Sequence, residues 1–197
     1  MKYGFIGCGN MGGALASAVA KTVGGENILL CDAFAEKAEA LAVSIGAKTA
    51  DAKTLAETCE YIFLGVKPQG FGAMLEEISD TLKARTDRFV LVSMAAGLSI
   101  WAIERMVGED YPVIRIMPNT PVAVGEGMVL YAANERVDNT QLDTFLEALS
   151  HAGKLDAIPE GKIDAASALS GCGPAFVYLF AEALADGAVA CGLSREK

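Results

Sequence analysis

The chain has 197 residues, a formal net charge of −9 and an apolar content of 52%. This length supplies one full domain and part of a second, and the apolar content is ample for a buried core. The acidic balance argues against nucleic acid or an anionic membrane as the main partner.

The numbers and positions of the cysteine, histidine and apolar residues argue against several further classes of protein. Five cysteines are scattered without a Cys-x-x-Cys pair, so we expect reduced, buried thiols in a cytoplasmic protein rather than a zinc site or disulfides. The only histidine, His151, disfavours a metal site and a histidine-based triad. The most apolar stretch, 175–193, carries Glu182 and Asp186 near its middle, which favours a buried or interface helix over a membrane span. Met1 and Lys2 lead directly into the first strand, so we expect no signal peptide.

The first twenty residues predict a strand over 2–6, a glycine-rich turn over 7–12 and an alanine-rich helix over 13–21. The turn has the pattern Gly-x-Gly-x-x-Gly. Its first glycine permits a tight turn, its second lets backbone amides approach a pyrophosphate, and its third lets the helix pack close to the strand. The diphosphate then lies at the positive end of the helix. This placement favours a dinucleotide site over the alternative of a βα turn that binds no ligand.

Apolar runs then alternate with amphipathic stretches. Continuous apolar strands separated by helices indicate a parallel sheet that is covered on both faces. The predicted fold class is therefore α/β, a Rossmann-type doubly wound parallel sheet. The expected strands are 27–31, 61–66, 89–93 and 112–116, and the expected helices are 36–45, 71–82 and 100–107.

The pattern loosens after Pro118, where we expect a strand over 128–132 and a helix over 140–151. Residues 158–161 form a junction, beyond which the chain is helical and rich in alanine. We expect the dinucleotide-binding domain to cover 1–158 and the beginning of an all-helical domain to cover 159–197. The last predicted helix, 175–191, has a wide apolar face that should contact a partner. This face consists of Ala175, Phe176, Leu179, Phe180, Ala183 and Leu184.

Asp32 ends the second predicted strand, about twenty positions past the glycines. In a Rossmann unit an acidic residue at this place binds the ribose hydroxyls. A carboxylate there favours a free 2′-hydroxyl and repels a 2′-phosphate. The alternative is that Asp32 only caps the turn after it.

Three further loops come after predicted strands, at the edge where open α/β sheets bind ligands. Their small residues would let a nicotinamide or ribose approach the backbone, and Lys67 would add positive charge. The alternatives are that Lys67 is an exposed lysine without a role and that proline only stiffens the loop after 112–116. The loops contain Val66, Lys67 and Pro68; Ala95, Ala96 and Gly97; and Met117, Pro118 and Asn119, of which the last three are expected near the substrate.

Five motifs occur together over the whole chain: Gly4-Phe-Ile-Gly-Cys-Gly-Asn-Met-Gly12, Val66-Lys-Pro-Gln69, Ser93-Met-Ala-Ala-Gly97, Arg115-Ile-Met-Pro-Asn-Thr-Pro121 and Leu169-Ser-Gly-Cys-Gly-Pro-Ala175. In this order and spacing they resemble the pyrroline-5-carboxylate reductases, which catalyse the last step of proline biosynthesis.

The resemblance implies hydride transfer from NADH or NADPH to the imine carbon of 1-pyrroline-5-carboxylate, which gives L-proline. It also implies a C-terminal helical domain that forms a homodimer or a higher homo-oligomer. Because a protonated imine is the better hydride acceptor, catalysis would consist mainly of positioning and electrostatics. The matching motifs imply two sets of cofactor contacts. The pyrophosphate would contact Ile6, Gly7, Cys8, Gly9, Asn10, Met11 and Gly12. The ribose and nicotinamide would contact Val66, Lys67, Pro68, Ala95, Ala96 and Gly97.

The chain departs from the family's pattern at three places. Asp32-Ala33 replaces a pair that often carries an arginine, so we expect NADH to be favoured over NADPH. Ala52 stands where an asparagine commonly faces the cofactor. Cys172 replaces a common serine, and we expect it to pack rather than to react.

Family members continue past Lys197 with a Ser-Pro-Gly-Gly-Thr segment that binds the substrate carboxylate, and no part of this sequence matches it. We therefore expect a fragment that lacks most of the dimerisation domain, and we name no catalytic side chain. Two alternatives stay open. One is another imine or β-hydroxyacid reductase with the same nucleotide domain, and the other is a nucleotide-binding module without turnover.

Overall fold

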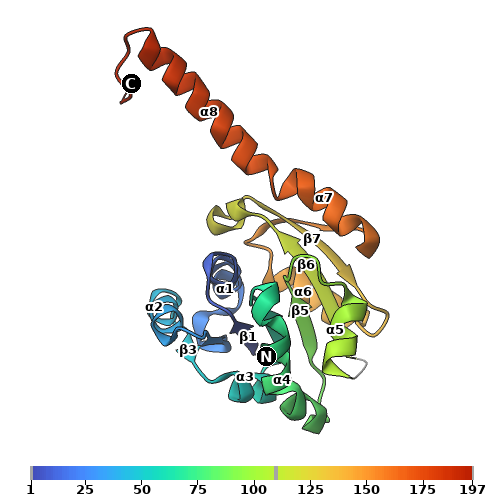
Figure 1. The fold of residues 1–197 in the computed structure, drawn as a ribbon. Coiled ribbons are helices and arrows are strands. Elements are labelled where there is room, and N and C mark those ends of the chain that lie inside the picture. The colour runs from blue at the N-terminus through green and yellow to red at the C-terminus, as the bar shows by residue number, and fades with distance from the viewer. Residues whose placement is uncertain (1, 109–110, 197) are drawn as a thin grey trace.

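A computed structural model describes residues 2–108 and 111–196. These residues form an eight-stranded sheet in the order β3-β2-β1-β4-β5-β6-β7-β8, with helices on both faces (Figure 1). The Rossmann-type α/β prediction is confirmed. The strands are β1 Tyr3–Ile6, β2 Ile28–Cys31, β3 Lys48–Thr49, β4 Tyr61–Leu64, β5 Val90–Ser93, β6 Val113–Pro118, β7 Gly127–Ala133 and β8 Gly153–Ala157.

Two separate apolar cores lie on the two faces of the sheet. Helices α1, α2 and α6 supply one core, and α3, α4 and α5 supply the other. The α-helices are α1 Asn10–Val23, α2 Ala35–Ile45, α3 Ala52–Thr58, α4 Pro68–Ala84, α5 Ile100–Val107, α6 Asn139–Ala148, α7 Ile163–Ser170 and α8 Gly173–Ala190, and the short 3-10 helices are η1 Gly25–Asn27, η2 Thr120–Val124 and η3 Glu160–Lys162.

The centre of the sheet is parallel and fully buried. β1 pairs with β4 in a register that sets Phe5 opposite Phe63, and their rings stack with centroids 4.3 Å apart. Since the chain crosses from one side of β1 to the other between β3 and β4, the point at which the strand order reverses lies between β1 and β4. The carboxyl ends of β1, β2, β4, β5 and β6 therefore share one edge.

Several elements differ from the sequence prediction. β7 runs antiparallel to β6, and β8 pairs parallel to β7. The short elements β3, α3 and β8 were not predicted, because β3 has two exposed residues and β8 carries Lys154 and Asp156 among few apolar ones. Helix α4 begins at Pro68 rather than at residue 71, because proline fits the first helical position. Helix α6 ends at Ala148, before residue 151.

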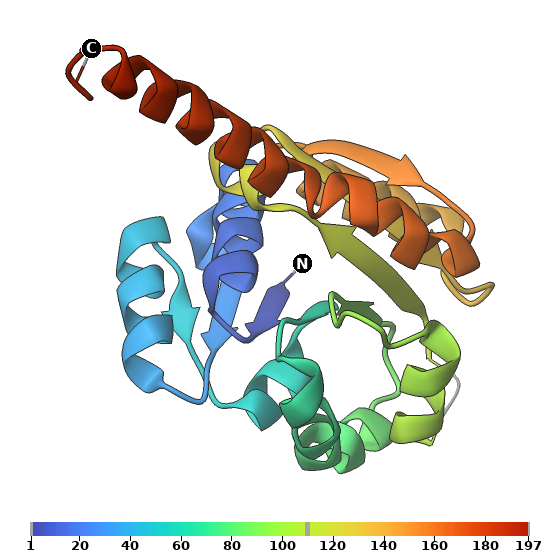
Figure 2. The ribbon, with the colours of Figure 1, turned by 45° about the horizontal axis from the view of Figure 1, so that its top comes forward.

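The C-terminal helices leave the body of the molecule. α7 lies against β7, and α8 continues beyond the sheet as an extended rod (Figures 1 and 2). α8, which the structure describes in full, has no buried residue. The predicted apolar face is exposed, and Val177 and Tyr178 outside that face are 64% and 67% exposed, so the helix is apolar on more than one side.

The thiols differ from expectation in part. Cys8 and Cys59 are buried and Cys31 is half-buried, as a reduced core requires. Cys172 and Cys191 are exposed, because the helix α8 beside them contacts nothing that would cover them. Cys172, which we expect to pack, is exposed in the single chain, so its packing stays a prediction.

Candidate nucleotide-binding site

The glycine turn joins β1 to α1 with very little space between backbones. Gly7 has a φ of +104°, and a Cβ on it would lie 2.6 Å from the carbonyl group of Gly65 after β4. A Cβ on Gly12 would collide with the carbonyl oxygen of Gly7. Two of the three motif glycines are thus required by packing alone.

Gly9 differs from its two neighbours in the motif. It is the N-cap of α1, and a Cβ on it would meet no atom within 4 Å. No side chain caps this helix, and its first turn contains no acidic residue. The first N–H groups of a helix have no carbonyl partner within the helix. The start of α1 therefore presents amides and a positive helix end to open space, which suits a phosphate group.

Asp32 lies beside this turn and is bonded through both carboxylate oxygens. Oδ2 accepts a hydrogen bond of 2.7 Å from the Cys8 amide, and Oδ1 accepts one of 2.9 Å from the Phe34 amide. The second bond is the local cap that the alternative interpretation proposed. The first fixes the carboxylate against the glycine turn, where a ribose next to a bound diphosphate would lie. Burial, with Asp32 nearby, raises the pKa of the Cys8 thiol to about 12, so this cysteine is an inert part of the turn.

A hollow of about 310 Å³ opens on the outer side of Asp32, between the end of β2, the start of α2 and the residues after β3. Its lining includes three carboxylates, those of Asp32, Glu39 and Asp51. Asp51 is also the N-cap of α3, and it accepts a 2.8 Å hydrogen bond from the Thr54 amide. Glu39 and Asp51 were not among the residues predicted from the sequence. Asp51, an N-cap residue type directly before Ala52, was a capping signal that could have identified α3.

Ala52, expected where relatives place a polar residue, is 4% exposed and packs into the core beside α4. The polar side chain that lines the hollow at this point is instead the preceding residue, Asp51. The difference arises from the helix α3, which begins at Ala52 and directs that residue inward.

The loops after β4 and β5 lie on the same edge as the glycine turn. Lys67 is exposed and is the N-cap of α4, and Pro68 is the first residue of that helix. Ala95 is buried, and its amide donates to the buried Ser93 hydroxyl at 3.3 Å. Ala96 and Gly97 are exposed, and Gly97 makes the turn with a φ of +75°. The structure thus brings the predicted nucleotide residues to one edge.

Asn119 lies after β6 at this edge and is almost buried. Its Nδ2 donates to the Ser170 carbonyl at 2.8 Å, and its Oδ1 accepts from the Met128 amide at 2.8 Å. Both ends of the amide are therefore used within the chain, while Met117 beside it is half-buried.

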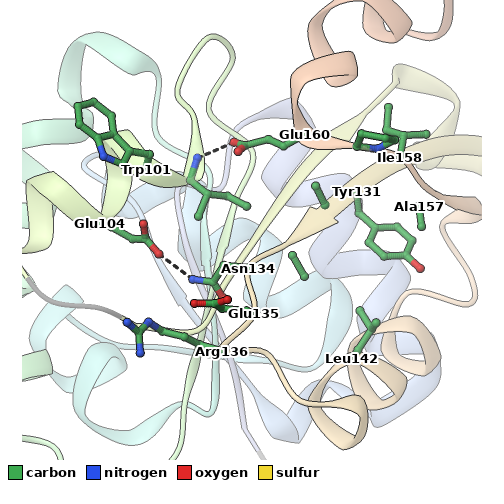
Figure 3. Close-up of a pocket in the computed structure, with 14 residues that line it drawn as sticks. Trp101, Glu104, Tyr131, Asn134, Glu135, Arg136, Leu142, Ala157, Ile158 and Glu160 are labelled. Carbon is green, nitrogen blue, oxygen red and sulfur yellow. Dashed lines mark hydrogen bonds between the residues drawn. The ribbon is translucent and has the colours of Figure 1, made fainter.

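A larger hollow of about 730 Å³ lies elsewhere, between α5, the end of β7 and residues 157–160 (Figure 3). Several of its polar groups are bonded within the chain. Asn134 Nδ2 donates to Glu104 at 2.8 Å, and Glu160 accepts from the Ile100 amide at 2.6 Å. It contains none of the residues predicted for the nucleotide or the substrate.

Family models match both parts of the chain. Residues 2–97 match "NADP oxidoreductase coenzyme F420-dependent", and residues 160–197 match "Pyrroline-5-carboxylate reductase dimerisation". A pyrroline-5-carboxylate reductase from Aquifex aeolicus is 36% identical over 198 aligned residues, which cover 100% of this chain and 72% of the relative. The chain belongs to the pyrroline-5-carboxylate reductase family.

Solved pyrroline-5-carboxylate reductases have the same fold. The Plasmodium falciparum enzyme, whose structure has NADP bound, is 36% identical with a TM-score of 0.85 over 100% of this chain and 72% of its own. The Coxiella burnetii enzyme is 30% identical with a TM-score of 0.88 over 99% of this chain and 73% of its own. An imine reductase from Myxococcus stipitatus, at 21% identity and a TM-score of 0.69, shares the fold.

Within the described residues, one helical stretch, Glu160–Ala190, is long and apolar enough to cross a membrane by length and composition alone. This stretch falls inside the match to the pyrroline-5-carboxylate reductase dimerisation family. An interface between subunits accounts for an exposed apolar helix equally well, because both environments exclude water from it.

Proposed function

We propose that this chain reduces 1-pyrroline-5-carboxylate to L-proline with a hydride from NADH. The carbon of the C=N bond accepts the hydride and the nitrogen takes a proton, which gives the secondary amine. Bound NAD(P)H supplies the hydride. The observation that carries the proposal is the open, uncapped start of α1 at Gly9, which lies where the strand order reverses in a chain of this family.

The residues of the sheet edge have distinct tasks in this proposal. The turn from Ile6 to Gly12 holds the pyrophosphate through backbone amides, with Cys8 and Asn10 supplying backbone rather than side-chain chemistry. The loops 66–68 and 95–97 hold the ribose and nicotinamide, and Lys67 adds a cation at the rim. Met117 and Pro118 border the substrate. Asn119 supports them from within, since its amide is fully bonded inside the chain.

Preference for NADH is expected from the charge of the hollow beside Asp32. Three carboxylates line it. A 2′-phosphate carries a charge of about −1.5 to −2, so each carboxylate would repel it, whereas a 2′-hydroxyl can donate to Asp32.

We also propose that 1–158 is the nucleotide domain and that 159–197 belongs to the helical dimerisation domain. The exposed apolar surface of α8 supports a second copy of this chain as its partner. The five cysteines are all free thiols, which supports a reducing compartment such as the cytoplasm.

Two measurements on the 197-residue chain test the reaction. The first titrates the chain with NADH and follows cofactor fluorescence. The second follows NADH oxidation with 1-pyrroline-5-carboxylate and, as a control, with a β-hydroxyacid-type carbonyl substrate. We expect NADH binding by this chain, and where NADH is oxidised, oxidation with the imine and not with the carbonyl substrate. Oxidation with the carbonyl substrate alone would instead identify a hydroxyacid-type reductase, and tight binding without product would identify a nucleotide-binding module.

A further inference from the structure

Helix α7 is bonded at one end to β6 and at the other to Asn119, the residue that follows this strand. It packs against β7, beside β6, on the face of the sheet to which Arg115 points. Arg115 and Asn119 both point to this face, because they alternate with Ile114 and Ile116, which pack in the opposite core. Each binds a different end of α7.

Arg115 binds the beginning of the helix. Its side chain is 4% exposed, and Nη2 donates to Asp164 in the first turn of α7 at 2.6 Å. Nη1 lies 3.5 Å from Glu160 in η3. The same Glu160 oxygen accepts from the Ile100 amide at 2.6 Å and so connects η3 to α5. A buried guanidinium requires such partners, since an unpaired buried charge is costly.

Asn119 binds the end of the helix. Its Nδ2 donates to the carbonyl of Ser170, the last residue of α7. The last carbonyls of a helix have no partner within the helix, so this bond satisfies one of them. The Oδ1 of Asn119 accepts from Met128 in β7 and holds the amide in this orientation.

The two attachment points match the length of the helix. Four residues of strand span about 13 Å, and the six steps from Asp164 to Ser170 span about 9 Å of helix, a difference that the long Arg115 side chain covers. We propose that Arg115 and Asn119 form a two-point clamp that fixes the direction in which α7, and through it α8, leaves the nucleotide domain. They are positioning residues for the helix that presents the exposed apolar surface.

The clamp matters because α8 is a long lever. Eighteen residues of helix extend about 27 Å, so a tilt of about 10° at α7 would move the far end of α8 by about 5 Å. No residue of α8 is buried in the body of the molecule, so its direction depends on the short segment between Ser170 and Gly173 and on the clamp.

Fluorescence transfer within the chain can measure this direction. Trp101, the only tryptophan, lies on α5 and serves as donor. A dansyl-type acceptor is attached to Cys191 after α8, in a Cys31→Ala/Cys172→Ser background. Burial raises the pKa of the Cys8 thiol to about 12 and that of the Cys59 thiol to about 11, so neither competes for the label. An excess of unlabelled Trp101→Phe chain, which carries neither donor nor acceptor, suppresses transfer between copies.

We expect a narrow distance distribution in this background and a distribution about twofold wider in the Asn119→Ala/Asp164→Asn double variant, because of the lever length. The Asp164 side chain is 69% exposed, so the single Asp164→Asn variant should fold and widen the distribution less. Asp156→Asn is the matched control, an exposed carboxylate on the neighbouring β8. Thermal melts establish that each variant is folded.

A double variant with the distance distribution of its parent would refute the clamp. An equal widening in Asp156→Asn, or a broad distribution in the parent, would also refute it. The readout needs neither nucleotide nor substrate, so a failure of the proposed reaction leaves this test intact.

Discussion

Gly9 and Gly12 belong to one motif but should respond in opposite ways to the addition of a single methyl group. In Gly12→Ala the new Cβ would collide with the Gly7 carbonyl oxygen inside the chain. In Gly9→Ala the Cβ would meet no atom within 4 Å and would project toward the open start of α1. The first change should therefore cost stability, and the second should cost nucleotide affinity.

The magnitudes can be worked from these contacts. Overpacking costs about 1–3 kcal/mol; contact with a backbone oxygen, which cannot rotate away, places this change in the upper part of that range, about 2–3 kcal/mol, and the helix propensity of alanine offsets about 1 kcal/mol of it. A net loss of about 1–2 kcal/mol lowers the Tm of a chain of this size by about 2–8 °C. For Gly9→Ala, the loss of one charge-assisted amide–phosphate bond, worth about 1.5–3 kcal/mol, weakens NADH binding about ten- to hundredfold. Its Tm should change little, because φ at Gly9 is −68° and suits alanine.

Thermal melts and NADH titrations on the same preparations separate the two effects. Gly72→Ala is the control, an exposed glycine within α4 where a Cβ also meets no atom within 4 Å. It should bind NADH normally and melt no lower than the parent. If Gly9→Ala binds NADH as tightly as the parent, the diphosphate does not lie at the start of α1. If Gly12→Ala melts at the parent temperature, the packing argument is wrong.

Three further outcomes are expected. Glu39→Gln should reduce the preference for NADH over NADPH about threefold, because it removes one negative charge from the hollow beside Asp32, whereas Glu36→Gln on the same helix should leave the preference unchanged. If titrations give the same ratio of NADH to NADPH affinity for Glu39→Gln as for the parent, the hollow is not part of the ribose site. Phe180→Asp on α8 should weaken self-association measured by sedimentation, and an unchanged monomer–dimer ratio would contradict a role in the interface. Burial raises the pKa of the Cys8 thiol from 9.0 to about 12, so the unfolded chain ionises first and the free energy of unfolding should fall as pH rises from 9 to 12. Urea unfolding of the parent and of Cys8→Ala over this pH range checks the prediction, because the free energy of unfolding of the variant should fall less steeply as the pH rises.

The sequence was sufficient for the parallel centre of the fold because its strands are buried on both sides. An apolar run such as 61–64 lacks the alternation of polar and apolar residues that a half-exposed strand shows, so it indicates a strand buried on both sides. The glycine motif defines the turn and the helix after β1. The outer elements have no such signal. β8 has a single half-buried leucine, Leu155, and β3 is two exposed residues long, so tertiary pairing rather than pattern defines them.

The site was predictable where the backbone acts and less so where side chains from distant elements meet. The turn 7–12 and the loops after β4 and β5 lie at the expected edge, because strand order alone brings them together. The carboxylates of Glu39 and Asp51 join Asp32 only through the packing of α2 and α3 against β2 and β3. The pairing of Arg115 with Asp164 spans 49 positions, and no local pattern indicates it.

The two outermost strands of the sheet determine how copies of this molecule can meet. β3 offers only Lys48 and Thr49 to a neighbouring strand, and β8 places the charged side chains of Lys154 and Asp156 along its exposed border. Short and charged borders resist extension of a sheet from one molecule into the next. Growth by strand addition is therefore discouraged at both sides, which leaves the exposed apolar helix α8 as the broad apolar surface of the described residues through which copies can meet.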